Sequence, residues 1–178
     1  MANLWATSAD GNTLTFNDSS SASKTSNITV PAFNVSAANG FSFEFKATLP
    51  STTNDWGAKI LSYGGCYVTI PNLDPWNNTI SGSTLTGKNA YPTIEGASLS
   101  SGLAYNSAFD GQEHTIKISF ASNSIVFYLD GATWVTYSSS LWNGGISEFI
   151  GYYETAIKAG ALTFNESGLT ITSLKVTK

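Results

Sequence analysis

The sequence predicts an all-β protein, a two-sheet antiparallel β-sandwich, and three observations support that fold class. Apolar and polar residues alternate over several short stretches, as they do in strands that bury one face. Clusters of Ser, Gly, Asn and Asp separate these stretches and are typical of turns between antiparallel strands. No stretch shows sustained helical periodicity. Because no internal repeat or linker is visible, we expect residues 1–178 to form one β-sandwich domain.

The first clear strand covers residues 41–49 and reads FSFEFKATL. Its apolar residues all have odd numbers, and the polar residues between them have even numbers. Side chains alternate between the two faces of a strand, so the apolar ones form one buried face. Pro50 has no backbone N–H, and turn-rich residues follow it, so the strand is expected to end there.

Two strands joined by a tight turn are predicted between Lys59 and Ile70. Gly64 and Gly65 form the turn, because glycine adopts positive φ angles at little cost. Residues 71–102 contain three prolines and little alternation, so we expect loops around one or two short strands there.

Residues 110–131, which read DGQEHTIKISFASNSIVFYLDG, predict a β-hairpin. Apolar and polar residues alternate on both sides of a polar turn at residues 121–124, so both strands bury one face against the same core. Asp130 and Gly131 predict a second tight turn, and a third strand of the meander follows around Trp134.

The region before the last strand is expected to contain a strand over residues 146–153 and at most one helical turn over residues 154–161. On such a strand the adjacent Tyr152 and Tyr153 face opposite sides, so only one of them can lie in the core.

The last predicted strand covers residues 169–178, and the N-terminal region is its expected partner. Its apolar residues change parity between Ile171 and Leu174. A β-bulge near Thr172 and Ser173 keeps them all on the core face.

The hairpin sequence, together with the early aromatic strand and the terminal LTITSLKVTK, resembles the laminin-G and concanavalin A-like superfamily of jelly rolls. In that superfamily an Asp-Gly pair leads into a His-containing strand, and the strand after the turn ends in Asp-Gly. The matching residues here are Asp110, Gly111, His114, Asp130 and Gly131. The resemblance implies a concanavalin A-like jelly roll with a structural His114. It leaves the function open, because the superfamily includes lectins, carbohydrate-binding modules, glycoside hydrolases and adhesion domains.

Composition and charge restrict the partners. Charged residues make up 11% of the chain, and none of them is arginine, the side chain that binds phosphate, sulfate and carboxylate groups at two points. This absence and the net charge of −4 argue against nucleic acid and favour a neutral ligand. Apolar runs are shorter than the ~20 residues of a membrane-spanning helix, so no membrane insertion is expected. The many hydroxyl and amide side chains suit an extracellular, cell-surface or virion protein, although residues 1–5 do not resemble a signal peptide.

The sequence contains few residues that could bind a metal ion or form a disulfide. The chain has one histidine, His114, and one cysteine, Cys66, which excludes an intrachain disulfide and any site of several imidazoles. Asp55 and Asp74, each with asparagine nearby, are calcium candidates, but neither lies in a dense run of acids. A structural calcium ion therefore stays open, and no other cofactor is predicted.

Glycoside hydrolysis by a retaining mechanism needs two carboxylates about 5 Å apart. Glucanases of the resembled superfamily carry them in a Glu-X-Asp-X-X-Glu arrangement, which this sequence lacks. Glu148 and Glu154 are too far apart on a strand, and Glu44 has no acidic neighbour on its face. We therefore predict that the chain is not an enzyme and keep glycoside hydrolase as an alternative.

Sugar binding is the chemistry that the sequence favours. It needs an aromatic face for the apolar side of a sugar ring, with amide or carboxylate groups for the hydroxyls. Three tryptophans lie in turn-rich segments beside Asn or Asp, whereas Trp5 and Trp134 are expected to be structural. The predicted ligand-binding residues are Trp76, Trp56, Trp142, Asn77, Asp74, Asn143 and Tyr91.

The predicted function is a non-catalytic, lectin-like carbohydrate-binding module for a neutral polysaccharide or glycan. An alternative is a structural or adhesion domain of a phage tail or bacterial surface protein, working within a larger multidomain or virion assembly. The two differ in partner, since the module binds a glycan and the adhesion domain docks to a protein.

Overall fold

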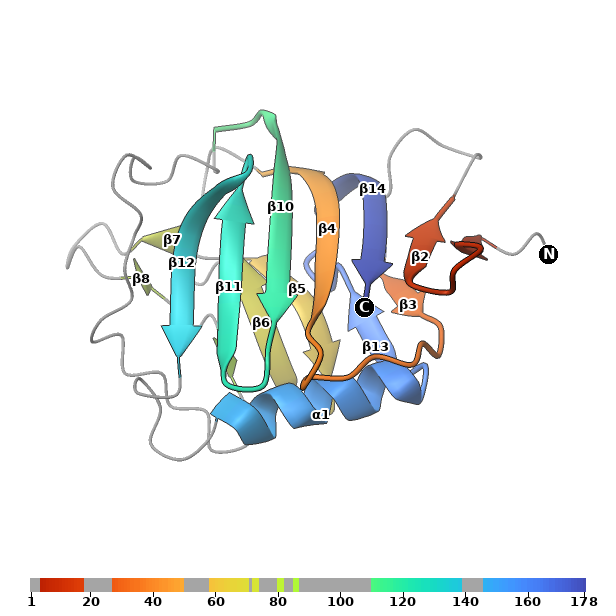
Figure 1. Cartoon of the computed structure of the whole chain (residues 1–178). Coiled ribbons are helices and arrows are strands. Elements are labelled where there is room, and N and C mark those ends of the chain that lie inside the picture. The colour runs from red at the N-terminus through yellow and green to blue at the C-terminus, as the bar shows by residue number, and fades with distance from the viewer. Residues whose placement is uncertain are drawn as a thin grey trace.

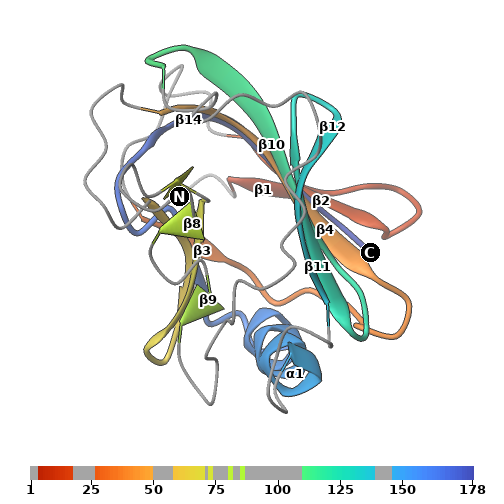
Figure 2. The same cartoon turned by 90° about the vertical axis from the view of Figure 1, so that its left-hand side faces the viewer.

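The computed structural model describes residues 4–17, 27–49, 58–70, 72–73, 80–81, 85–86, 110–138 and 146–178. Most of these residues lie in two antiparallel sheets packed face to face (Figures 1 and 2). The predicted fold class, a two-sheet antiparallel β-sandwich of the jelly-roll type, is confirmed. In the described part of the chain, no helix is long and apolar enough to cross a membrane.

The larger sheet has seven strands and the smaller one five, and a separate pair completes the described strands. In spatial order the larger sheet contains β1 (Trp5–Thr7), β2 (Thr13–Phe16), β14 (Thr170–Thr177), β4 (Phe41–Thr48), β10 (Glu113–Phe120), β11 (Ser124–Leu129) and β12 (Ala132–Ser138). The smaller sheet contains β3 (Ile28–Val30), β13 (Leu162–Phe164), β5 (Ala58–Tyr63), β6 (Cys66–Ile70) and β9 (Leu85–Thr86). The separate pair is β7 (Asn72–Leu73) with β8 (Ile80–Ser81).

Strand β4 lies in the middle of the larger sheet and buries the face that its alternation predicts. Phe43 and Phe45 are fully buried, and both rings contact Phe164 of the smaller sheet, at centroid distances of 6.4 and 5.0 Å. The core therefore lies between the two sheets, and aromatic rings from both layers fill it.

The predicted meander and turns are confirmed. Strands β10, β11 and β12 pair in sequence, and the second turn has positive φ angles at Asp130 (49°) and Gly131 (84°). Gly64 and Gly65 form the turn between β5 and β6. These are the positions where Asp and Gly accept the left-handed region at low cost.

The bulge in the last strand is confirmed as well. Strand β14 lies between β2 and β4, and its register against β4 shifts between Ile171 and Ser173. The shift lets Ile171, Leu174 and Val176 all face the core, where each is at most 3% exposed.

The strand predicted over residues 146–153 is wrong. These residues form the first part of an α-helix, α1 (Ile146–Lys158), and the single turn predicted after them is the rest of it. Apolar residues at helical spacing form its buried face, which consists of Ile146, Phe149, Ile150, Tyr153, Ala156 and Ile157.

Helix α1 lies across one open end of the sandwich (Figures 1 and 2). Tyr153 contacts both layers, because its ring lies 6.1 Å from that of Phe120 in β10 and its hydroxyl donates to the Leu61 carbonyl in β5 (3.5 Å). On a helix the adjacent Tyr152 and Tyr153 do not point in opposite directions, so the reasoning from sheet faces does not apply to them. The helix therefore closes the core at this end.

Candidate functional site

The sequence-predicted ligand-binding residues fall outside the described part of the chain. This holds for Trp76, Trp56, Trp142, Asn77, Asp74, Asn143 and Tyr91, and also for the calcium candidate Asp55. Their roles stay predictions. The two tryptophans expected to be structural are described: Trp134 is 4% exposed, and Trp5 packs edge-on against Phe16 at 5.1 Å.

The described strands show where the predicted loops are attached. The segment that carries Trp56 joins the end of β4 to the start of β5, on the side of the sandwich away from α1 in Figure 1. The segment that carries Trp76 joins β7 to β8, and this pair lies at the left-hand edge of Figure 1. The segment that carries Trp142 joins β12 to α1, at the end that the helix covers. The predicted tryptophans are therefore attached in three places.

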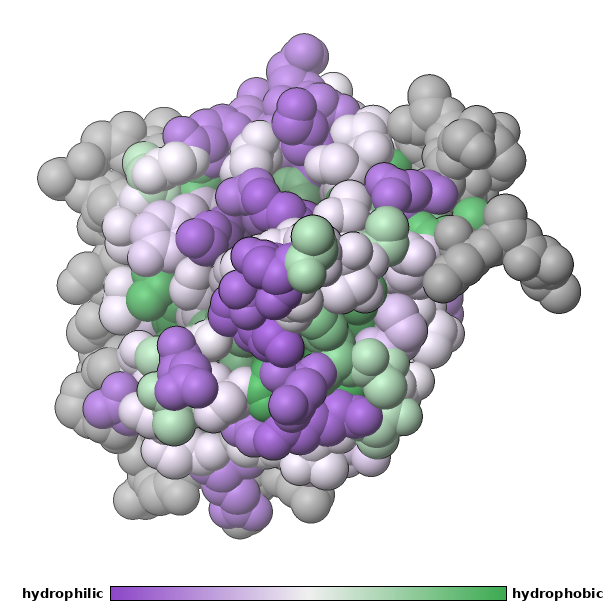
Figure 3. Space-filling model, turned by 45° about the vertical axis from the view of Figure 1, so that its right-hand side comes forward, coloured by the Kyte–Doolittle hydropathy of each residue, from purple (hydrophilic) through white to green (hydrophobic). Residues whose placement is uncertain are grey.

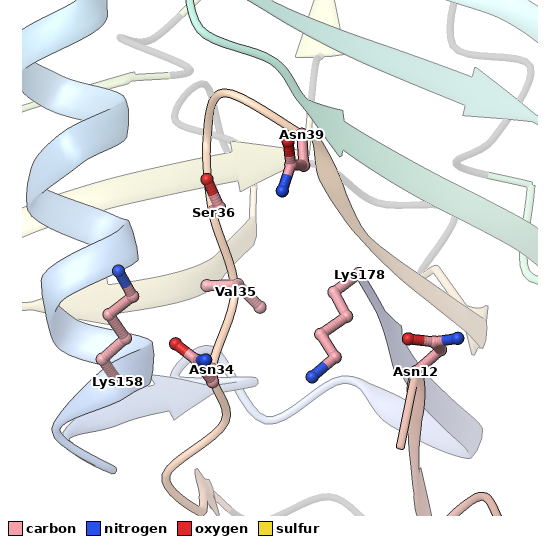
Figure 4. Close-up of a pocket in the computed structure, with 7 residues that line it drawn as sticks. All are labelled: Asn12, Asn34, Val35, Ser36, Asn39, Lys158 and Lys178. Atoms are coloured by element: carbon pink, nitrogen blue, oxygen red, sulfur yellow. The ribbon is translucent and has the colours of Figure 1, made fainter. Parts of the chain in front are cut away.

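A polar pocket in the described structure lies where four separate segments meet (Figure 4). Its volume is about 340 Å³, near the lower end for ligand-binding pockets. The segments are the loop between β3 and β4, the turn between β1 and β2, the end of α1 and the end of β14. The lining residues are Asn12, Asn34, Val35, Ser36, Asn39, Lys158 and Lys178. Figure 3 shows the side of the molecule where the N-terminal strands lie, with hydrophilic residues gathered around recessed apolar ones.

The loop between β3 and β4, residues 31–40, forms one wall of the pocket and is fixed to α1 by its backbone. The Phe33 N–H donates to the Ile157 carbonyl (3.1 Å), and the Ala37 N–H donates to a carboxylate oxygen of Glu154 (2.8 Å). Val35, between these anchors, is only 1% exposed. The loop therefore presents its polar side chains from a fixed backbone.

The end of α1 touches this loop at Gly160. Its φ is +67°, and an added Cβ there lies 2.9 Å from the Ala32 backbone nitrogen. Glycine is the residue that commonly ends a helix in the left-handed region. It is also the residue that allows the helix end and the loop to approach this closely.

Glu154 and Lys158 form an ion pair beside the pocket. The Lys158 ammonium donates to Glu154 Oε1 (2.6 Å), while Oε2 accepts the Ala37 N–H. The Lys158 hydrogen bond, followed by that from Ala37, lowers the pKa of the Glu154 carboxyl. An ionised Glu154 thus balances the charge of Lys158 and holds the loop.

The opposite wall is the turn between β1 and β2. Asp10 accepts hydrogen bonds from Ser8 Oγ (2.5 Å), from the Asn12 N–H (3.0 Å) and from Asn12 Nδ2 (3.1 Å). The bond from Ser8, followed by those from Asn12, lowers the pKa of Asp10. The Lys178 N–H donates to the Asn12 carbonyl (3.0 Å), which joins the turn to the end of β14. In Figure 4 the side-chain amide oxygen of Asn12 lies on the side of Lys178.

Three polar side chains of the pocket have no partner in the described part of the chain: Asn34, Ser36 and Asn39. Each amide offers two donors and an acceptor, and the hydroxyl offers one donor and two acceptor positions. Lys178 faces Asn34 across the pocket, with its ammonium 5.1 Å from the centroid of the Phe33 ring. The pocket can therefore bind a small ligand rich in oxygen atoms.

The side chains that line the pocket include no carboxylate, imidazole or thiol. General acid–base and nucleophilic catalysis by side chains depend mostly on such groups. The arrangement in the described structure is therefore suited to binding.

His114 lies in a separate cluster and holds two turns together. Its Nδ1 pairs with Asp130 (2.7 Å) and its Nε2 with Asp110 (3.0 Å), and Asp130 also accepts the Thr115 N–H (2.9 Å). Partial burial lowers the pKa of His114, but the hydrogen bonds to Asp130 and Asp110 outweigh it, so this pKa is raised. The contacts are those of a structural residue, as the family resemblance implies.

Metal ligands do not cluster in the described ranges. No group of three or more His, Cys, Asp or Glu side chains there could hold a metal ion. The predicted calcium candidates, Asp55 and Asp74, lie outside those ranges.

Sequence reasoning missed the pocket residues. Asn34, Ser36 and Asn39 stand in a polar stretch between two strands, which reads as an ordinary loop in a chain rich in Asn and Ser. Asn34 is marked only by its place between two buried apolar residues, Phe33 and Val35. Ser36 and Asn39 belong to the turn before Gly40, so the sequence explains them as ordinary turn residues.

Comparisons with known proteins give structural likeness alone. No family model matches the sequence, and no curated protein matches it closely enough to be a relative. A galectin from Caenorhabditis elegans is similar at a TM-score of 0.44 and 13% identity, over 86% of this chain and 90% of the galectin. Domain 4 of an extracellular arabinanase from Geobacillus stearothermophilus, solved with arabinotriose, is similar at a TM-score of 0.41 and 12% identity. The likeness covers 98% of this chain and 74% of the arabinanase chain. An endo-1,3-β-glucanase from Streptomyces sioyaensis is similar at a TM-score of 0.36 and 13% identity, over 98% of this chain and 73% of the glucanase. By their names, these proteins bind or act on carbohydrates.

Proposed function

We propose that this chain is a non-catalytic carbohydrate-binding domain and that the polar pocket holds one sugar unit. The observation that carries this proposal is the convergence of Asn34, Ser36 and Asn39, which have no partner among the described residues, on one pocket of about 340 Å³. Sugar hydroxyls both donate and accept, and amide and hydroxyl side chains match them in both roles. A bound sugar unit therefore gives hydrogen-bond partners both to its own hydroxyls and to these three side chains.

The positions of the acids support a non-catalytic role. Asp110 and Asp130 bond opposite nitrogens of one imidazole, so the His114 ring lies between them. Glu44 pairs with Lys175 and Glu154 with Lys158. Described carboxylates in these positions are occupied by protein partners, whereas a retaining glycosidase needs two that face one substrate about 5 Å apart.

The loop tryptophans supply the second part of the proposal. We propose that Trp56, Trp76 and Trp142 stack on neutral units of the same glycan, with Asp74, Asn77, Asn143 and Tyr91 bonding to hydroxyls. An aromatic ring covers the apolar face of a pyranose, which the amide-lined pocket does not.

The setting and the superfamily are also proposals. Low charge and abundant hydroxyl and amide groups support an extracellular, cell-surface or virion location. The bridging contacts of His114 support membership of the laminin-G and concanavalin A-like superfamily.

A glycan array followed by calorimetry tests the proposed function. The double variant N34A/N39A removes four amide donors and two acceptors from the pocket. We expect it to weaken binding of the best array ligand about tenfold or more, at an unchanged melting temperature. N123A, in the exposed turn between β10 and β11, is the matched control and keeps full affinity. Equal affinities of N34A/N39A and the control contradict the pocket as the site.

A further inference from the structure

The charges around the pocket are distributed unevenly. The chain has twelve acidic residues against eight lysines. Yet the lining residues include two lysines and no acid. A pocket with this lining is complementary to a ligand that carries negative charge.

One of the two lysines is already neutralised. The ammonium of Lys158 lies 2.6 Å from Glu154, whose other oxygen accepts the Ala37 N–H, so this pair is fixed by the loop. Lys158 can still donate to a ligand, but its charge is balanced.

Lys178 differs from Lys158. No described carboxylate side chain pairs with its ammonium, which lies 5.1 Å from the Phe33 ring centroid and faces Asn34 across the pocket (Figure 4). Asp10, the nearest acid of the opposite wall, bonds to Ser8 and Asn12 and does not line the pocket. The pocket therefore offers one ammonium that no described acidic side chain pairs with, beside neutral donors.

We infer that the sugar unit in the pocket carries one carboxylate group, as a hexuronate does, with Lys178 binding the carboxylate and the amides of Asn34 and Asn39 binding ring hydroxyls. This inference rests on the proposed function. It departs from the neutral glycan that the absence of arginine favours, because a lysine binds a carboxylate as a point charge without the fork geometry of arginine.

Two matched sugar pairs test the inference. Galacturonate differs from galactose, and glucuronate from glucose, at carbon 6 alone, so the difference in affinity reports the carboxylate. Backbone amide shifts of Asn34, Asn39 and Lys158 in two-dimensional NMR titrations locate binding in the pocket. We expect one uronate to bind about three- to tenfold more tightly than its neutral partner, and high salt to reduce that ratio.

Two lysine variants assign the effect to one ammonium. In K178Q the uronate is expected to bind no more tightly than the neutral sugar. K175Q is the matched control, because Lys175 lies on β14, three residues before Lys178, but pairs with Glu44 on the outer face of the larger sheet. We expect it to keep the full preference, and melting temperatures confirm that both variants fold.

The outcomes separate the two proposals. Equal binding of uronates and neutral sugars in the pocket, or a preference that survives in K178Q, overturns the inference and leaves the proposed function standing. If none of the four sugars nor any array glycan shifts the pocket amides, the proposed function fails, and the inference fails with it.

Discussion

Replacing Gly160 with alanine tests how the pocket wall is held. Gly160 has φ +67°, and the new Cβ lies 2.9 Å from the Ala32 nitrogen, a backbone atom that cannot rotate away. An L-residue in the left-handed region costs ~1–2 kcal/mol. Forcing the loop and the helix end apart adds ~1–3 kcal/mol, as overpacking of well-packed sites does.

Gly11 provides the control for this substitution. Its φ is +71°, close to that of Gly160, but nothing lies within 4 Å of an added Cβ. G11A therefore pays the backbone cost alone, and the difference between the variants isolates the contact of the helix end with the loop. We expect G160A to be ~1–3 kcal/mol less stable than G11A.

Urea denaturation followed by tryptophan fluorescence measures both free energies of unfolding. In a chain of this length, ~1 kcal/mol corresponds to ~2–4 °C in melting temperature, so thermal scans give a second measure. Equal losses in G160A and G11A refute the close approach of α1 to the loop, and with it our account of how the pocket is positioned.

Three further predictions concern other parts of the molecule. The pKa of His114 is raised, so its bonds to Asp110 and Asp130 stabilise the fold fully below about pH 6.5 and lose this effect as the pH rises through the folded-state pKa. H114Q is expected to abolish this part of the pH dependence of the unfolding free energy in urea titrations. An unchanged pH profile contradicts the bridging role. Asn165 is fully buried at φ 65° and bonds through its side chain to both the N–H and the carbonyl of Leu169 (each 2.8 Å). Asn165→Gly keeps the backbone but leaves these groups unpaired, at a cost of ~2–4 kcal/mol in chemical denaturation; a loss below about 1 kcal/mol speaks against the buried bonds. Trp76→Ala is expected to weaken glycan binding by ~1–3 kcal/mol with an unchanged melting temperature, and retained affinity in calorimetry removes Trp76 from the site.

The strands that could be predicted are those whose burial follows from local alternation. In β4 and β10, each apolar residue stands two positions from the next, so one face is buried whatever the partner is. The bulge in β14 could be predicted as well. The apolar residues change parity between Ile171 and Leu174, and only a bulge lets the side chains on both sides of this change face the core.

Helix α1 was missed because its sequence supports two interpretations. Residues 146–153 are rich in β-branched and aromatic residues, which favours a strand locally, and Gly151 lowers the helix propensity. The helical spacing of Ile146, Phe149, Ile150 and Tyr153 is visible only over a longer window. Contacts of Tyr153 with both sheets favour the helix, and the sequence does not show those contacts in advance.

The pocket could not be predicted for a different reason. Asn12, Asn34, Lys158 and Lys178 come from four segments that are far apart in the chain. Their residue types are common throughout this sequence, and no fixed spacing joins them. These residues come together because the loop between β3 and β4 packs against α1, and that packing depends on Gly160 and Glu154.

The place of β14 between β2 and β4 determines how a nascent chain can fold. While the ribosome is still making the later segments, one side of β4 has no neighbour, and its open backbone groups can recruit strands from other chains. The N-terminal hairpin of β1 and β2 must wait unattached until β14 emerges and joins it to the sheet. Until the final strand is made, the phenylalanine-rich β4 thus has an unpaired edge that is prone to aggregation. Chaperones or a low expression temperature protect the chain during this stage.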